Sequence, residues 1–343
     1  MIRLSTRLLS AIALIALFVP ALEAVAQQHV PPAPEAAPQQ GAPVMEQPAP
    51  APAAPAPSTV PVFPKTDPAN FTAASPTKEV VDSFLQANWG YDDSRMWQVE
   101  AIVKTPADGV SKVVVLAADK GPKPQISPLI FFTLPDGKHI IAGDSVINFG
   151  AHPFAETREQ MQQRAEGPYR GSASKDLELV EFADFQCPHC KEAQANMDKL
   201  VQDFPKARIV FQLFPLASIH PEAVRAAEYG LCVSKMGSST AFFQFSAAVF
   251  DGQEGLATAD GATLTLNSAV TKAGLDPAKV ATCAATPEIK AALDASIKLG
   301  TDEGINQVPT LVINGRQILA NAPYDLLKKM VEYQAKADGV AAQ

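Results

Sequence analysis

The stretch 177–190, with the sequence LELVEFADFQCPHC, decides the fold of this chain. Residues 177–183 form a mostly apolar run of strand length, and the pattern from 188 to about 201 is helical. Cys187 and Cys190 therefore stand where a buried strand leads directly into a helix. At such a junction the free backbone N–H groups and the helix dipole stabilise a thiolate. The spacing predicts a reactive cysteine at the start of the helix.

The two cysteines are predicted to form a catalytic dithiol. A thiolate attacks disulfides, and a second thiol three positions further on can resolve the mixed disulfide that results. We assign Cys187 as the nucleophile and Cys190 as the resolving residue. Pro188 suits the first helical turn, where its missing N–H would have no partner. The imidazole of His189, if it is charged or aims its N–H at the thiolate, makes the disulfide a stronger oxidant.

Two other interpretations of a CxxC motif are half of a zinc site and an inert disulfide. Zinc requires further ligands at close spacing, whereas Cys232 and Cys283 are far from each other and from any paired histidine. We expect no metal and no organic cofactor, because the cysteine pair is itself the redox group. Cys232 and Cys283 are expected to form a structural disulfide that closes a loop of about 50 residues. Two buried free thiols are the alternative.

The region after the motif has the element order of an α/β fold. A second strand is predicted at 207–214, helices occupy much of 221–299, and strand patterns return at 310–313 and 317–319. A last amphipathic helix follows at about 324–336. Strand, helix, strand, a block of helices, two strands and a helix make an α/β domain with a helical insertion.

The beginning of the chain has the pattern of an export signal. Arg3 and Arg7 precede an apolar run at 8–19, and the small residues at 24–26 provide a cleavage site. Cleaved export places the protein in the periplasm, where disulfides persist. Residues 27–68 are rich in Pro, Ala and Gln, which predicts an extended spacer of polyproline type.

Between the spacer and the cysteine motif the sequence predicts a small α+β domain. A helical pattern at 78–88 precedes strand patterns, and Asp136-Gly137 is a two-residue hairpin signal. The strand patterns lie at 98–103, 111–116, 129–133 and 138–142. The polar helix at 155–165 is interpreted as a connector. The expected organisation is a signal peptide at 1–26, a disordered linker at 27–76, an α+β domain at 77–150, a connector helix within 151–172 and a catalytic domain at 173–343 with its insertion at about 221–300.

Residues 181–186 followed by Cys-Pro-His-Cys resemble the periplasmic Dsb thiol:disulfide oxidoreductases, DsbA in particular, over about 176–336. The resemblance implies a thioredoxin-like fold. It also implies that Val308, Pro309 and Thr310 form a cis-proline loop facing the cysteines, where the Val308 backbone offers a strand edge to unfolded substrates. Glu181 aligns with a buried acid of that family, which implies a raised pKa and a proton relay to the resolving cysteine. A strand residue that points to water is the alternative for Glu181.

The region around 130–149 resembles the dimerisation domain of the disulfide isomerases DsbC and DsbG. This second resemblance implies a homodimer and leaves two activities open, oxidation and isomerisation of disulfides. The partners implied are unfolded or partly folded secreted proteins and a redox partner, expected in the membrane, that resets the cysteines. A non-catalytic chaperone and an envelope scaffold are further alternatives. His220, before a predicted helix, is interpreted as structural.

Composition excludes one class of partner. The 343 residues carry a net charge of -8, with acidic and basic residues interleaved. No basic stripe is available for a phosphate backbone, so we expect no nucleic acid. A hydrophobic content of 47% is enough for one large or two ordinary domains.

Overall fold

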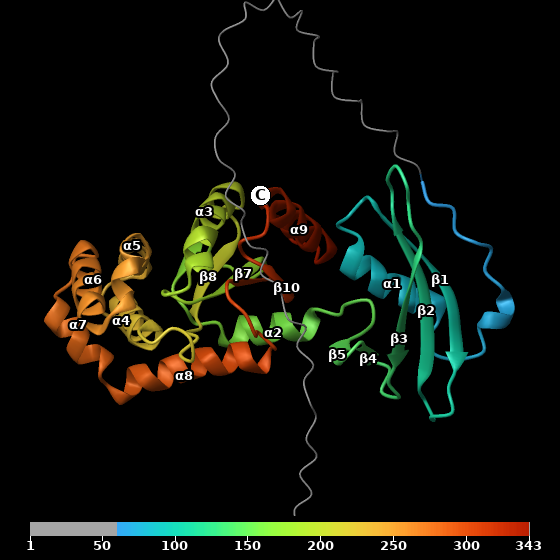
Figure 1. Ribbon diagram of the computed structural model, residues 1–343, viewed down its shortest axis with the longest axis horizontal. Coiled ribbons are helices and arrows are strands. Elements are labelled where there is room, and N and C mark those ends of the chain that lie inside the picture. The colour runs from blue at the N-terminus through green and yellow to red at the C-terminus, as the bar shows by residue number, and fades with distance from the viewer. Residues whose placement is uncertain (1–59, 343) are drawn as a thin grey trace, which may run out of the picture. The chain divides into compact units, whose positions relative to one another are not determined.

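The computed structural model describes residues 60–342 (Figure 1). The predicted signal peptide at 1–26 and the predicted linker up to residue 59 lie outside the described residues. Within the described range, none of the helices combines the length and the apolar character that a membrane span requires.

An antiparallel sheet and one helix make up the first folded region. The elements are α1 (Lys78–Trp89), β1 (Arg95–Lys104), β2 (Ser111–Asp119), β3 (Ser127–Thr133), β4 (His139–Ala142) and β5 (Ser145–Asn148), with the strands in sequence order in the sheet. Helix α1 buries Val81, Phe84 and Leu85 against the sheet residues Val113 and Phe131. A turn at Asp136-Gly137 joins β3 to β4, as predicted, but it is not the predicted two-residue turn. The Leu134 N–H bonds to the His139 carbonyl and the Gly137 N–H bonds to the Leu134 carbonyl, and of the two turn residues only Gly137 has a positive φ, of 66°. The short strand β5 was not predicted.

The disordered linker that was predicted to reach residue 76 ends earlier. A 3₁₀ helix spans Pro68–Asn70, and the Asp67 carboxylate caps it by accepting a bond of 2.9 Å from the Ala69 N–H. Phe71 then pairs with Ile102 of β1 and packs against the core of the sheet. The predicted linker boundary at residue 76 is wrong because the Pro/Ala-rich composition dominated the prediction. Phe71 lies within that segment, and burial of its apolar ring is favourable.

The second sheet carries the cysteine motif. Its strands are β6 (Tyr169–Gly171), β7 (Glu178–Ala183), β8 (Arg208–Leu213), β9 (Thr310–Ile313) and β10 (Arg316–Leu319), in the order β10-β9-β7-β8-β6. Strand β7 is central, parallel to β8 and antiparallel to β9. All six of its residues are buried, which explains why the sequence shows an apolar run and not an alternating pattern.

Helices cover both faces of β7. On one face Leu179 packs with Met197 of α3 (Pro188–Asp203) and Leu327 of α9 (Tyr324–Ala337). On the other face Phe182 packs with Met161 of α2 (Ala155–Arg164) and with Leu299 of α8 (Pro287–Asp302). Helix α2 is thus more than the predicted connector, because its one buried residue belongs to the core beneath the cysteine strand.

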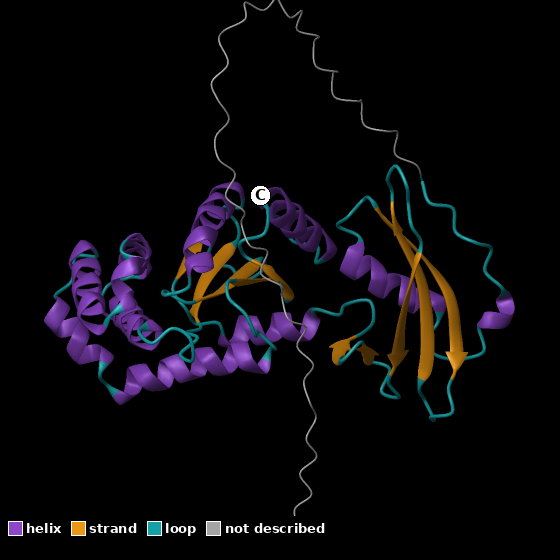
Figure 2. Cartoon of the chain, in the orientation of Figure 1, coloured by secondary structure: helices purple, strands orange, loops and turns teal. Residues whose placement is uncertain are grey.

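The predicted helical insertion lies between β8 and β9. It comprises α4 (Ala223–Met236), α5 (Ser239–Asp251), a 3₁₀ helix at Gln253–Ala257, α6 (Ala259–Lys272), α7 (Pro277–Ala284) and α8 (Pro287–Asp302), drawn in purple in Figure 2. Phe185, which follows β7, is buried among the aromatic residues Phe211, Phe242 and Phe245. The insertion therefore packs directly against the segment that leads into the cysteine motif.

A disulfide joins Cys232 of α4 to Cys283 of α7, with their Cα atoms 5.9 Å apart and a sequence separation of 51 positions. The disulfide expected from the sequence is present, and the alternative of two free thiols is not. Because α4 and α7 are in contact in the insertion, the bridge ties together its first and fourth α-helices.

The double substitution Cys232→Ala/Cys283→Ala is expected to lower the free energy of unfolding by about 4 kcal/mol, because the unfolded chain regains the freedom of the closed loop. Urea unfolding of the oxidised protein measures the loss. The matched control is Cys187→Ser in the same assay, which leaves the bridge intact. A loss below about 1 kcal/mol in the double variant would contradict the expectation.

Candidate dithiol site

Cys187 is the residue that caps helix α3. Its backbone is extended, with φ -79° and ψ 120°, and the helix begins at Pro188 as predicted. The Cys187 N–H donates to the carbonyl of Asp184 at 3.1 Å, which closes a tight turn between strand and helix. Both cysteines are free thiols; Cys187 is 6% exposed and Cys190 is 0% exposed. Of the two sulfurs, only Cys187 has any access to solvent.

The two thiols differ strongly in acidity. Hydrogen bonding from the Cys190 thiol, helped by the N–H groups of Cys190 and His189, lowers the pKa of Cys187 to about 6 against the opposing effect of burial. Burial raises the pKa of Cys190, and donation to the Cys187 sulfur raises it further. At neutral pH the pair therefore consists of a Cys187 thiolate and a Cys190 thiol. This asymmetry supports the assignment of Cys187 as nucleophile and Cys190 as resolving residue.

Of the two possibilities that the sequence left for the His189 imidazole, an N–H aimed at the sulfur or a charged ring, the structure does not show the first. Its side chain is 62% exposed, and Nδ1 lies 3.0 Å from a carboxylate oxygen of Glu192. Hydrogen bonding to Glu192, and then its charge, raise the pKa of His189. The prediction missed Glu192, which lies one helical turn away and offers the imidazole a full charge. His189 reaches the Cys187 thiolate through its backbone N–H, and its ring contributes only a long-range charge.

The loop of Val308, Pro309 and Thr310 lies against the cysteines. The Val308–Pro309 peptide bond is cis, and the Cys187 sulfur lies 3.9 Å from the Val308 carbonyl oxygen. Thr310 is buried, pairs with Phe182 across β9 and β7, and donates its hydroxyl to a loop carbonyl at 2.8 Å. Because β9 is the antiparallel neighbour of β7, residues some 120 positions further along the chain reach the reactive sulfur.

Glu181 is buried, at 1% exposed, so the alternative of a residue pointing to water is wrong. Its carboxylate accepts a bond of 2.8 Å from the Gln194 amide, which also donates to the Cys190 carbonyl at 3.1 Å. Burial raises the pKa of Glu181 to about 7, while the charge of Arg170 and the bond from Gln194 oppose the rise. A carboxyl group that exchanges its proton near neutral pH thus lies behind the resolving cysteine.

Two glutamines that the sequence analysis did not select hold the cysteine turn. The amide of Gln253 donates to the carbonyls of Phe185 at 2.8 Å and Cys187 at 3.0 Å. The amide of Gln186 donates to the Leu256 carbonyl at 3.0 Å. These bonds join the 3₁₀ helix of the insertion to the turn. Gln186 entered the sequence analysis only as part of the motif 181–186, and nothing there indicated Gln253, because the bonded partners are 66 to 70 residues apart in sequence.

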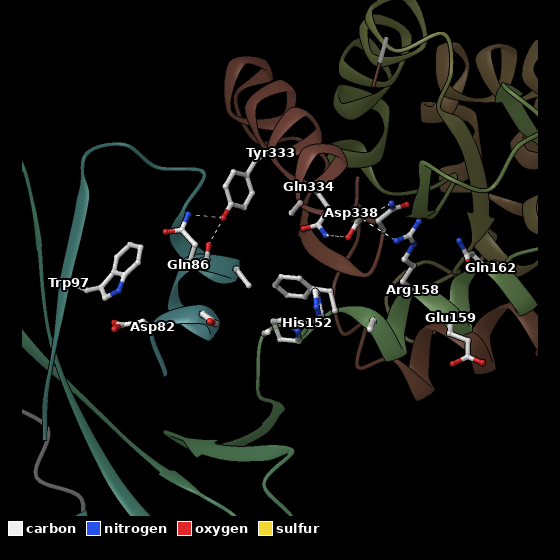
Figure 3. Close-up of a pocket in the computed structure, with 18 residues that line it drawn as sticks. Asp82, Gln86, Trp97, His152, Arg158, Glu159, Gln162, Tyr333, Gln334 and Asp338 are labelled. Carbon is white, nitrogen blue, oxygen red and sulfur yellow. Dashed lines mark hydrogen bonds and ion pairs between the residues drawn. The ribbon is translucent and has the colours of Figure 1, made fainter. Parts of the chain in front are cut away.

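Figure 3 shows a cavity that neither cysteine of the dithiol lines. It has a volume of about 850 Å³ and is lined by α1, α2 and α9, and none of its lining residues is a predicted site residue. Its polar groups bond to one another: Tyr333 donates to the Gln86 carbonyl at 2.5 Å, and Asp338 accepts from Asn314 at 2.8 Å. The lining includes no cysteine, so the dithiol chemistry is not located there.

Residues 60–342 contain no group of three or more His, Cys, Asp or Glu side chains placed to hold a metal ion. The redox-active groups that the structure brings together are the two cysteine sulfurs. The arrangement can exchange electrons with another disulfide or dithiol without any further group.

A central strand that ends in a CxxC turn, a helix that begins at the motif and a cis-proline loop against the first sulfur define a thioredoxin-fold protein with a dithiol site. Residues 163–333 match the family model described as Thioredoxin. This part of the chain belongs to the thioredoxin family.

Among curated proteins, the chain is similar to the Na(+)/H(+) antiporter NhaA 3 of Salinispora tropica, with 33% identity over 91 residues. The match covers 26% of this chain and only 14% of the antiporter's length. Among solved structures, the thiol-disulfide exchange protein alpha-DsbA2 from Wolbachia pipientis has 21% identity and a TM-score of 0.45, over 52% of this chain and 96% of that one. The catalytic domain of Proteus mirabilis ScsC has 20% identity and a TM-score of 0.44, over 52% and 98%.

Alkylation of the reduced protein by iodoacetamide is expected to follow the Cys187 thiolate, with a rate that rises with pH and has its midpoint near pH 6. Cys190→Ala removes the thiol that donates to Cys187, so its midpoint is expected to move toward 9. Cys190→Ser retains a donor and serves as the matched control. A wild-type midpoint near 9 would show that the turn does not stabilise the thiolate.

Glu181→Gln is expected to stabilise the reduced protein at pH 8 and to change its stability little below pH 4.5. Below the unfolded pKa the carboxyl is protonated in both states. As pH rises through the folded pKa of about 7, the native state must carry a buried charge and loses up to about 3 kcal/mol. Urea unfolding at pH 4.5 and pH 8 measures the difference between wild type and variant. An equal difference at both pH values would contradict the buried, neutral acid.

Proposed function

We propose that the chain is an exported thiol:disulfide oxidoreductase that introduces disulfides into unfolded or partly folded secreted proteins. The observation that supports the proposal most strongly is the difference in acidity between the two thiols of the motif. Cys187 has a pKa of about 6, whereas Cys190 keeps its proton. A stabilised thiolate stabilises the reduced enzyme. Stabilising the reduced form makes the Cys187–Cys190 disulfide a strong oxidant.

In the proposed cycle the enzyme starts with a Cys187–Cys190 disulfide. A substrate thiolate attacks the Cys187 sulfur, since Cys190 is inaccessible, and the sulfur–sulfur bond breaks with its electron pair on Cys190. Glu181, which holds a proton up to about pH 7, protonates the leaving Cys190 sulfur. A second substrate thiolate then attacks the substrate sulfur of the mixed disulfide and expels Cys187 as a thiolate. The substrate loses two electrons, and the enzyme retains them as a dithiol.

The proposed binding site for substrate is the loop of Val308, Pro309 and Thr310. The Val308 carbonyl points at the Cys187 sulfur, so a chain that pairs with this backbone would bring its own cysteine to the reacting atom. Main-chain pairing requires no particular side chain. Recognition of this kind suits an enzyme that acts on many unfolded secreted proteins.

Export to the periplasm and the redox partner also belong to the proposal. The pattern at residues 1–26 supports cleaved export, and the Cys232–Cys283 disulfide suits an oxidising compartment. Because the cycle leaves the enzyme reduced, a separate oxidant must reset the cysteines, and we place that redox partner in the membrane. The proposed chemistry involves no metal, organic cofactor or nucleic acid.

A second candidate function is a dimeric disulfide isomerase or reductase. The small sheet supports it by exposing apolar side chains on consecutive strands at its β5 end: Ile130, Phe132, Ile141, Val146 and Ile147. Exposed apolar clusters of this kind mark contact surfaces. A homodimer formed there would give one molecule two dithiols.

The deciding measurement is the equilibrium between the dithiol and the disulfide of Cys187 and Cys190 in glutathione buffers. A potential near -120 mV is the expected result for an oxidant, whereas one near -270 mV would reverse the direction of electron flow. Cys187→Ser should abolish both this equilibrium and oxidative refolding of a reduced substrate. If Cys187→Ser still protects an unfolded client and the cell loses nothing, a non-catalytic chaperone is the correct function.

A further inference from the structure

We propose that Asp184 and His220 form a buried positioning pair that holds the cysteine turn and determines how readily Cys187 becomes a thiolate. The inference deepens the proposed function, because it concerns the same dithiol. It gives His220 a second role beyond the structural one expected from its sequence, and it assigns a role to Asp184, which the sequence analysis used only as part of a motif.

Asp184 connects three segments at the active site. Its carboxylate accepts from the N–H of Gln186 at 2.7 Å, the N–H of Leu216 at 2.8 Å and Nδ1 of His220 at 2.8 Å. Its backbone carbonyl accepts from the Cys187 N–H at 3.1 Å. The end of β7, the cysteine turn and the loop after β8 therefore meet at one side chain, whose exposed fraction is 0%.

The same residue also touches the second sulfur. The Asp184 N–H lies 3.4 Å from the Cys190 sulfur and donates to it. The backbone of Asp184 thus contacts both cysteines of the dithiol, through the Cys187 N–H and through the Cys190 sulfur. A shift of this residue would alter the geometry of both groups that react.

His220 is fixed on the other side of the carboxylate. Its N–H donates to the Leu216 carbonyl at 2.9 Å, so His220 and Leu216 belong to one closed turn and bind the same carboxylate oxygen of Asp184. The imidazole is only 17% exposed. Since an ionised carboxylate can only accept, Nδ1 must carry the proton of this bond. His220 therefore anchors Asp184 whether or not its ring is charged.

The pair has an electrostatic effect on the dithiol. Three donors and no acceptor surround the Asp184 carboxylate, an arrangement that the ionised form satisfies completely. The Asp184 charge raises the pKa of Cys187, in opposition to the hydrogen bonds that lower it. The His220 imidazole, which donates to this carboxylate, offsets part of its negative charge. The charge therefore raises the pKa of Cys187 less than it otherwise would. Without His220, the Asp184 carboxylate would have one hydrogen-bond donor fewer, and its charge would raise the pKa of Cys187 further.

Other charged groups close to the pair have their own partners. Glu222, two residues after His220, lies 3.5 Å from the Arg225 guanidinium, and the His189 ring pairs with Glu192. Glu181 is bonded to Gln194. His220 is the side chain that pairs with Asp184 in the described part of the chain.

The test measures the alkylation midpoint and the thiolate absorbance of Cys187 in the reduced full-length protein, with four variants. His220→Ala is expected to raise the midpoint by about one pH unit, which lowers the alkylation rate at pH 6 about fivefold. His220→Asn supplies an amide N–H in place of Nδ1 and is expected to restore most of the rate. Asp184→Asn removes the charge and is expected to lower the midpoint.

The double variant His220→Ala/Asp184→Asn separates charge from structure. If the pair acts through charge, the double variant returns toward the wild-type midpoint although it has lost both partners. An unchanged midpoint in His220→Ala, or a double variant no nearer to wild type than His220→Ala, would overturn the inference. If His220→Ala does not fold, Asp184→Asn decides alone: a lowered midpoint supports the inference and an unchanged one overturns it. Alkylation requires no redox substrate, so the wild-type potential tests the proposed function separately.

Discussion

The burial of β7 and the immediate start of α3 at its end are the constraint on which the rest of the structure depends. The strand lies in the middle of its sheet with both faces covered, so the chain must leave it by a tight turn. That turn places Cys187 at the helix start with its sulfur close to backbone N–H groups, and it places Cys190 one turn inside, in the core. The packing of β7 and the turn that follows it therefore place the two sulfurs in different environments.

The same burial has opposite effects on neighbouring groups. For Cys187, hydrogen bonds to the thiolate outweigh desolvation, and its pKa falls to about 6. For Cys190 and Glu181, desolvation is the largest effect, and both keep their protons to a higher pH. The proposed chemistry needs this contrast, since it uses a stable thiolate at Cys187 and a proton donor, Glu181, at the same site. A uniformly buried or uniformly exposed site would provide only one of them.

The helical insertion contributes more than volume. It surrounds Phe185 with aromatic rings, and Gln253 holds the carbonyls of Phe185 and Cys187. His220, in the loop that leads into the insertion, holds Asp184. Each of these bonds reaches the turn from a segment distant in sequence. The turn is therefore supported from several sides, which is what keeps a reactive thiolate in a defined geometry.

Much of this protein was determined by local sequence. The apolar run, the CxxC spacing, Pro188 and the periodicity further on were enough to predict α3, β8, β9 and the insertion, because these signals act between residues a few positions apart. The tertiary structure alone decided that Glu181 is buried, that the His189 ring pairs with Glu192, that Phe71 joins the first core and that Asp184 meets His220. Burial and long-range pairing depend on which surfaces pack together, and a local pattern does not encode partners tens of residues away.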